Sequence, residues 1–62
     1  MNNKFPIILS HPLEGREGYM LFAQSWLDAK REAIRIHGRY SKGWKLELFD
    51  DGELTFERTH NS

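Results

Sequence analysis

The sequence predicts an α+β domain of order β-β-α-β-β, in which a four-stranded antiparallel sheet carries one helix on one of its faces. Residues 25–38 place apolar side chains every three or four positions, which is typical of an amphipathic helix. Residues 5–9, 19–24 and 44–58 alternate or cluster apolar side chains between turn-forming residues, which is typical of strands.

The first third of the chain predicts two strands and a polar connection. Phe5 to Leu9 is apolar and short, and its proline is tolerated near the start of a strand or at an edge. Residues 10–18 hold a proline, two glycines and three charged residues, which favours a long loop. The second strand, residues 19–24, directs one set of side chains to each face: Tyr19, Leu21 and Ala23 to one, Met20, Phe22 and Gln24 to the other.

The helix has a clear start and a clear stop. The hydroxyl of Ser25 can accept a hydrogen bond from a free backbone N–H of the first turn. Gly38 is expected to end the helix as the residue that follows its last turn. The stripe expected to face the sheet consists of Trp26, Ala29, Ala33, Ile36 and His37.

The last third predicts a hairpin, for which two registers compete. A two-residue turn at residues 51–52 would mix polar and apolar side chains on both faces. A three-residue loop over residues 50–52 keeps them apart, so we expect that loop, with Gly52 in the left-handed position. It pairs Leu48 with Leu54, Leu46 with Phe56 and Lys45 with Glu57, and directs these side chains to the helix: Trp44, Leu46, Leu48, Leu54 and Phe56.

Length and composition limit the class of protein. A chain of 62 residues forms a single domain, expected over residues 1–62 with residues 59–62 as a frayed tail. The chain has no cysteine, which excludes disulfides and thiolate chemistry. No apolar stretch approaches the ~20 residues that span a membrane, so we expect a cytoplasmic protein.

Charge is balanced in total but unevenly distributed. Nine basic residues match nine acidic ones. Residues 30–45 carry six basic side chains against one acidic, a net +5, whereas residues 46–62 carry one basic against five acidic, a net −4. Such asymmetry can orient the encounter with a charged partner.

The chain offers little for catalysis. His11, His37 and His60 fall in a loop, at a helix end and in the tail, without the spacing of metal ligands. Asp50 and Asp51 are better explained as turn formers than as calcium ligands. No glycine-rich phosphate loop is present. We therefore expect a protein that is not an enzyme and needs no cofactor or metal.

One candidate binding surface is the basic helix face of Lys30, Arg31 and Arg35, extended by Arg39 and Lys42. Such a face is often merely solvated. Lys30 departs from the helical pattern, because it projects at the edge of the apolar stripe between Trp26 and Ile34. Its aliphatic stem can lie over Trp26.

The second candidate is the sheet face away from the helix, where Met20, Phe22 and Phe49 project, with Ile8 beside them. One helix cannot cover both faces of a sheet, so a partner or a second copy can occupy this one. The pattern predicts a self-association face and a homodimer formed by sheet stacking.

One set of residues between positions 16 and 35 has a distinctive spacing: the run Arg16-Glu17-Gly18, then Ala23 and Ser25, then Ala29-Lys30-Arg31 with Ala33. This spacing resembles that of a small phage anti-CRISPR family that inhibits type I-F surveillance complexes. A weaker likeness connects the same pattern to a small phage inhibitor of bacterial RNA polymerase.

The first resemblance implies a non-enzymatic inhibitor in the host bacterial cytoplasm. It implies binding to the backbone subunits of the CRISPR surveillance complex, so that target DNA is occluded, with nonspecific contact to DNA as an addition. The family's basic residues correspond to Lys30, Arg31 and Arg35. The hairpin over residues 44–58 does not clearly repeat the family's motifs.

Other functions remain open. Arg39, Tyr40 and Lys42 could form a weak, sequence-nonspecific nucleic-acid site. In an inhibitor of RNA polymerase, the acidic hairpin residues Asp50, Asp51 and Glu53 would meet a basic protein surface. A structural dimer without inhibitory activity is the remaining alternative.

Overall fold

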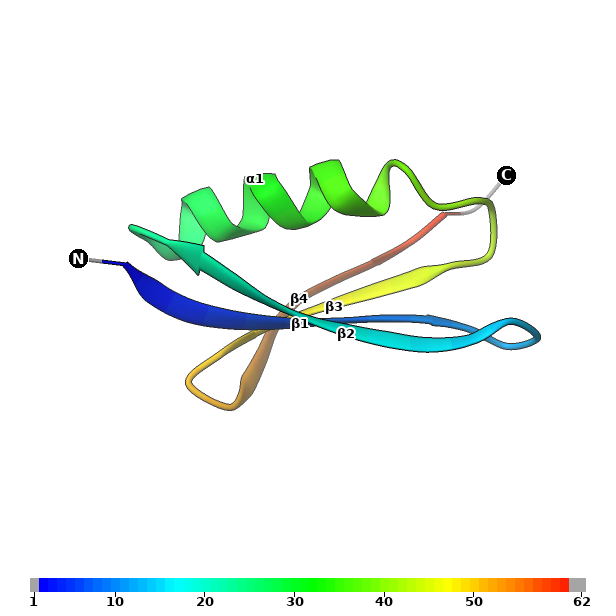
Figure 1. Ribbon diagram of the computed structural model, residues 1–62, viewed down its shortest axis with the longest axis horizontal. Helices are drawn as coiled ribbons and strands as arrows, with labels where there is room; N and C mark the ends of the chain where they lie inside the picture. Colours follow the sequence, from blue (N-terminus) through cyan, green and yellow to red (C-terminus); the bar gives the residue numbers. More distant parts are fainter. Residues whose placement is uncertain (1, 61–62) are drawn as a thin grey trace.

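The computed structural model describes residues 2–60 and confirms the expected order of elements. All strand pairs are antiparallel, and the sheet has the order β2-β1-β3-β4. In Figure 1 the helix lies along one face of the twisted sheet, and no other described segment covers the opposite face. The elements are β1 (Asn3–His11), β2 (Gly15–Ala23), α1 (Trp26–His37), β3 (Lys45–Asp50) and β4 (Glu53–Thr59).

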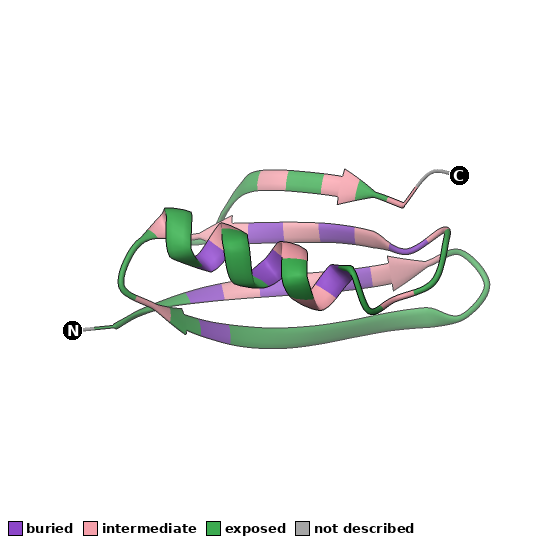
Figure 2. Ribbon diagram, turned by 90° about the horizontal axis from the view of Figure 1, so that it is seen from above, coloured by how far each residue is buried: buried purple, intermediate pink, exposed green. Residues whose placement is uncertain are grey.

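The hydrophobic core lies between α1 and the two central strands. Alternate residues of β1 and β3 point to the helix, and Figure 2 shows their buried positions beneath it. The helix contributes Ala29 and Ala33, whose small side chains let its backbone approach the sheet closely. The buried apolar residues are Phe5, Ile7, Leu9, Leu21, Ala29, Ala33, Trp44, Leu46 and Leu48.

The sequence predicts both ends of α1. The Ser25 hydroxyl accepts a hydrogen bond from the Asp28 N–H at 3.3 Å, which confirms the predicted cap. Gly38 follows the last helical residue, which confirms the predicted stop, and its backbone is right-handed, with φ −62°. The chain leaves the helix through tighter bonds, from Arg39 N–H to the Ile36 carbonyl and from Tyr40 N–H to the His37 carbonyl. No helix within the described residues is long and apolar enough to cross a membrane.

The connection between the first two strands is much shorter than expected. β1 and β2 pair from Asn3 with Ala23 to His11 with Gly15, so only residues 12–14 form the turn. Residues 15–18, which are charged or glycine, belong to β2. Because this part of the strand is exposed on both faces, it does not have to alternate apolar and polar side chains. Polar composition therefore concealed a strand at the sheet edge.

The second hairpin has the register that the sequence argument rejected. Asp50 pairs with Glu53, so the turn contains only Asp51 and Gly52, both with positive φ (53° and 83°). This is the geometry of a two-residue hairpin turn whose twist matches that of the strands. The predicted three-residue loop was wrong.

A bulge reconciles the short turn with an apolar inner face. Phe49 pairs with Leu54, whereas the preceding Leu48 pairs with Phe56, so Thr55 is an extra residue in β4. Phe56 thereby returns to the helix side, as expected. Leu54 does not: it shares the outer face with Phe49 and is 44% exposed, which corrects its predicted place in the core.

The predicted charge pair across the hairpin exists, but diagonally. Lys45 lies opposite Thr59, and its Nζ is 3.6 Å from Glu57 and 3.9 Å from Glu47. Glu47 and Glu57 face one another directly, so Lys45 offsets a repulsion between like charges.

The expected frayed tail does not begin at Thr59. Thr59 is the last residue of β4, and the His60 N–H donates to the Trp44 carbonyl at 3.2 Å. The Gly43 N–H donates in turn to the His60 carbonyl at 3.1 Å, which ties the chain end to the entry of β3. Residues 61–62 lie outside the described residues.

Candidate functional site

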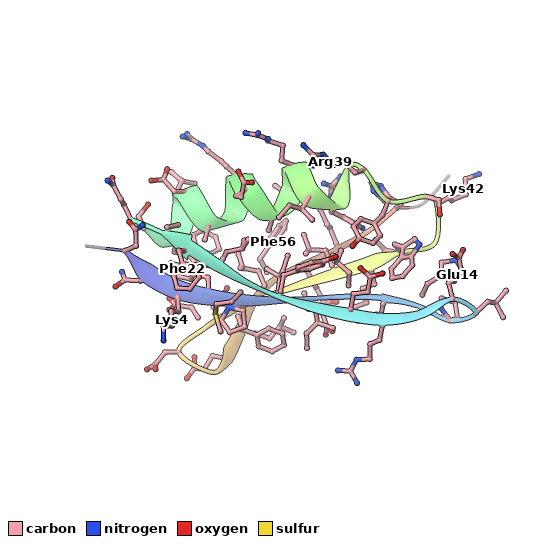
Figure 3. The ribbon with its side chains drawn as sticks, viewed as in Figure 1. Lys4, Glu14, Phe22, Arg39, Lys42 and Phe56 are labelled. Atoms are coloured by element: carbon pink, nitrogen blue, oxygen red, sulfur yellow. The ribbon has the colours of Figure 1, made fainter. Side chains whose placement is uncertain are left out.

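Four cations form an exposed row on the helix side of the molecule, and we call it the basic strip: Arg31, Arg35, Arg39 and Lys42. Arg31 and Arg35 are one turn apart on the outer surface of α1. Arg39 and Lys42 follow the helix in the chain, and Figure 3 shows Arg39 near its last turn and Lys42 farther along the loop, on the same side of the sheet. The structure thus brings together four of the five basic residues that the sequence singled out.

The basic strip is largely free of internal ion pairs. Arg35 is 72% exposed, and its guanidinium lies 3.7 Å from the Glu32 carboxylate, itself about half exposed. Such an exposed pair contributes little to stability. Within residues 2–60, Arg31, Arg39 and Lys42 form no ion pair. Their charges are therefore available to an anionic partner.

Lys30 is set apart from the other cations. Its Nζ lies 4.8 Å from the ring centroid of Phe56 and 5.3 Å from that of Trp26, and the residue is half-buried. The ammonium therefore faces two aromatic rings beside β4. The structure supplies a packing reason for the lysine that broke the helical pattern.

The sheet face away from α1, which we call the far face, carries an apolar patch: Pro6, Ile8, Met20, Phe22, Phe49 and Leu54. Met20 and Phe22 are 47% and 61% exposed, as expected for residues facing away from the helix. Met20 lies opposite Pro6, and Phe49 lies opposite Leu54, so the patch reaches across all four strands. Leu54 was missed because the two-residue turn, which pairs it with Phe49, had been rejected.

A cluster that the sequence argument missed joins β2 to the loop after the helix. The Tyr40 hydroxyl donates to Glu17 Oε1 at 2.6 Å, the Tyr19 hydroxyl donates to the same atom at 2.8 Å, and the two phenol oxygens are 3.1 Å apart. The Tyr40 ring also packs edge-on against Trp44. Tyr40 is therefore not the free aromatic that a nucleic-acid site would need. Extending the strand alternation back to residue 17 would have placed Glu17 beside Tyr19.

These bonds change how the cluster titrates. The Tyr40 hydroxyl, followed by that of Tyr19, stabilises the ionised carboxylate and lowers the pKa of Glu17. Partial burial, together with the carboxylate of Glu17, raises the pKa of Tyr40 well above its ordinary value. The cluster therefore favours an ionised Glu17 carboxylate beside a neutral Tyr40 phenol.

Two histidines stack at the other end of the core. The rings of His37 and His60 lie 3.9 Å apart at 26°, with His37 fully buried. His37 Nε2 lies 2.8 Å from the Trp44 carbonyl, and His60 Nε2 lies 2.6 Å from the His37 carbonyl, so both nitrogens donate. Within residues 2–60, His37 Nδ1 has no hydrogen-bond partner. Burial, above all, lowers the pKa of His37.

His11 also has a structural role. Its Nδ1 accepts the backbone N–H groups of Leu13 at 3.1 Å and Glu14 at 3.2 Å, which closes the β1–β2 turn. Its ring tilts against Trp44 and lies so close to Gly43 that a Cβ there would meet Nε2 at 2.8 Å. Gly43, with φ 96°, thus permits both the left-handed backbone and this contact.

The described surface offers contact areas and no enclosed site. Within residues 2–60, no group of three or more histidine and acidic side chains is arranged to hold a metal ion, and no pocket is present in that part of the chain. The candidate functional surfaces are therefore the basic strip and the apolar patch, on opposite sides of the fold. No protein-family model, no curated protein and no solved structure matches this chain, so its function is inferred from these surfaces.

Proposed function

We propose that this protein is a non-enzymatic inhibitor that docks its basic strip on a host CRISPR surveillance complex and occludes the binding of target DNA. The observation that carries the proposal is the row of exposed cations, of which Arg31, Arg39 and Lys42 have no ion pair within residues 2–60. The likeness of residues 16–35 to a phage anti-CRISPR family supports the choice of target.

The strip suits occlusion because all four cations are exposed, two on the helix and two on the loop that follows it. Cations arranged along one side can bind acidic side chains of the complex or the phosphates of the DNA, and neither contact requires that bases be read. Arg31 and Arg35 are the central contacts, and Arg39 and Lys42 extend them. Lys30 supports the helix through its packing on Phe56.

Direct nucleic-acid binding is less well supported. That function would use Tyr40 between Arg39 and Lys42, but the Tyr40 ring packs on Trp44 and its hydroxyl is bonded to Glu17. Single-stranded binding depends on aromatic faces that bases can stack on. The acidic turn that an inhibitor of RNA polymerase would use shows no feature beyond turn formation.

The test is inhibition of target-DNA binding by a purified type I-F surveillance complex, with complex binding measured after nuclease treatment. An Arg31→Glu/Arg35→Glu variant should lose binding by about 10-fold or more, since two favourable charges become repulsive. The matched control is Lys4→Glu/Arg16→Glu, which makes the same charge change at exposed positions on the far face. Equal loss in both variants, or undiminished inhibition by the first, would contradict the proposal. Binding of DNA alone that falls steeply with salt would favour the nucleic-acid alternative.

A further inference from the structure

The two edges of the sheet are protected to different degrees. β4 carries a bulge at Thr55 and three charged residues, Glu53, Glu57 and Arg58. Bulges and charges are the usual means by which proteins prevent an edge strand from pairing with another chain. The β4 edge is therefore shielded.

β2 has none of these protections over its second half. It pairs with β1 without a register shift, and residues 18–23 contain no charge and no proline. Tyr19, Met20 and Phe22 are 45%, 47% and 61% exposed. Figure 2 shows β2 on the outside of the sheet, with no described segment beyond it. Such a regular, apolar and open edge is a template for a further strand.

We infer that β2 pairs in antiparallel orientation with β2 of a second copy, across a two-fold axis at Leu21, to form one continuous eight-stranded sheet. The inference does not depend on the proposed function. It also differs from the sheet-stacked dimer that the sequence suggested, because it uses the edge of the sheet and not its face.

We assign the strand that pairs with β2 to a second copy of this chain, because the sequence of β2 is complementary to itself in antiparallel pairing. An axis at Leu21 places Met20 opposite Phe22 of the partner copy and Tyr19 opposite Ala23 of the partner copy, which are all uncharged pairs. The charged residues Arg16 and Glu17 fall beyond the paired stretch. No like charges meet, so an isologous interface can form without repulsion.

Other registers are worse for stated reasons. An axis at residue 19 would place Arg16 opposite Phe22 of the partner copy and Glu17 opposite Leu21 of the partner copy, next to apolar side chains. An axis midway between two residues would pair odd with even positions and place the outer face of one strand beside the inner face of the other. The axis at Leu21 avoids both faults.

The pairing would also extend the apolar patch. The Met20 and Phe22 side chains of the two copies form two sulfur–aromatic pairs on the far face, and the two patches become one. Because the axis is perpendicular to the sheet, both helices lie on the same side. The two basic strips then face the same direction, so the dimer presents two equivalent docking surfaces.

The first experiment measures molecular mass by sedimentation equilibrium between roughly 1 μM and 1 mM, the range of weak to moderate self-association. The unmodified protein should approach the dimer mass. Phe22→Lys should raise the dimer dissociation constant about tenfold or more, because it places a charge at the apolar edge. The matched control is Leu54→Lys. It introduces the same charge at an exposed apolar residue of the far face, but on β4, at the opposite edge of the sheet. It should leave the dimer intact, and circular dichroism should show both variants folded.

The second experiment tests the register. The chain has no cysteine, so any disulfide that forms must join the introduced cysteines. Equimolar Met20→Cys and Phe22→Cys proteins should yield mainly the mixed disulfide, identified by mass. Predominant Met20→Cys homodimers would indicate an axis at residue 20 and would overturn the proposed register.

Three results would overturn the interface itself. One is a monomer throughout the concentration range, and another is a dimer that Leu54→Lys weakens as much as Phe22→Lys does, which would indicate stacking of far faces. The third is hydrogen exchange of the amides of residues 18–22 that is independent of protein concentration, because edge pairing must protect outward N–H groups of that strand.

Discussion

The ammonium of Lys30 lies over the ring of Phe56, with 4.8 Å between Nζ and the ring centroid. The bulge in β4 makes this possible, because it returns Phe56 to the helix side. The aliphatic stem of Lys30 lies beside apolar rings while its charge stays at the protein surface. A lysine at the edge of the apolar stripe is therefore explained by packing, whether or not it also binds a partner.

Lys30→Ala should lower the free energy of unfolding by about 1 kcal/mol, because it removes both the stem and the cation–π contact. Arg31→Ala, at an exposed neighbouring position without an ion pair in residues 2–60, should change it by less than about 0.5 kcal/mol. Urea denaturation measures both. If the two variants lost equal stability, the packing role of Lys30 would be excluded.

Thr55→Val should destabilise the protein by about 1 kcal/mol, although valine suits a strand. The Thr55 hydroxyl accepts the Trp26 indole N–H at 2.7 Å and donates to the Leu48 carbonyl at 3.2 Å, so it connects α1 to the bulge. Thr59→Val, on the same strand and without a side-chain hydrogen bond in residues 2–60, is the control and should be nearly neutral. Thermal unfolding of both variants checks this, and unchanged stability in Thr55→Val would contradict it.

Tyr40→Phe should raise the pKa of Glu17, because it removes the stronger of the two hydroxyl donors to its carboxylate. Tyr19→Phe should raise it by a smaller amount, since its hydrogen bond is the second cause of the shift. NMR titration of the Glu17 side-chain carbon measures both values in otherwise folded protein. The reverse order of the two effects would count against the geometry of this cluster.

Acidification should reduce stability from about pH 6.5 downward through His37. Its folded pKa lies below its ordinary 6.5, so the unfolded chain binds the proton more readily than the folded chain. Well above pH 6.5 both states are neutral at this site and its contribution to the free energy of unfolding is constant. The groups facing its ring are His60, stacked upon it, and Arg58, whose charge also opposes protonation.

His37→Gln is the variant that isolates this effect, because the amide can still donate to the Trp44 carbonyl but does not titrate. The slope of unfolding free energy against pH should decrease between pH 5 and 6.5, by at most ~1.4 kcal/mol per pH unit for one proton. Denaturant midpoints across that range give the slope. A slope identical to that of the unmodified protein would assign the pH dependence to other groups.

The order of elements, the Ser25 cap and most of the core could be predicted because they depend on local patterns that span one element. The hairpin register could not. The two-residue turn was rejected because it mixed polar and apolar faces, but a bulge restores the inner face one residue later. The pattern of apolar and polar residues in β4 does not reveal that Thr55 is an extra, unpaired residue.

The candidate surfaces show the same division. The exposure of Arg31, Arg35, Met20 and Phe22 follows from helical and strand periodicity, which the sequence contains. The engagement of Tyr40 with Glu17 depends on how the loop after the helix folds over β2, and that is a tertiary contact between distant segments. The stacking of His60 on His37 is of the same kind, since it joins the end of the chain to the end of the helix.

The strand order β2-β1-β3-β4 has a kinetic consequence. Each hairpin closes a short loop and can form early from local contacts, whereas the central pairing, which sets Ile7 beside Leu48, joins the two ends of the chain across the whole helix. We expect that docking of the two preformed hairpins limits the folding rate. Substitutions in either hairpin, outer strands included, should then slow folding, because the hairpin contacts are already present when the two units dock.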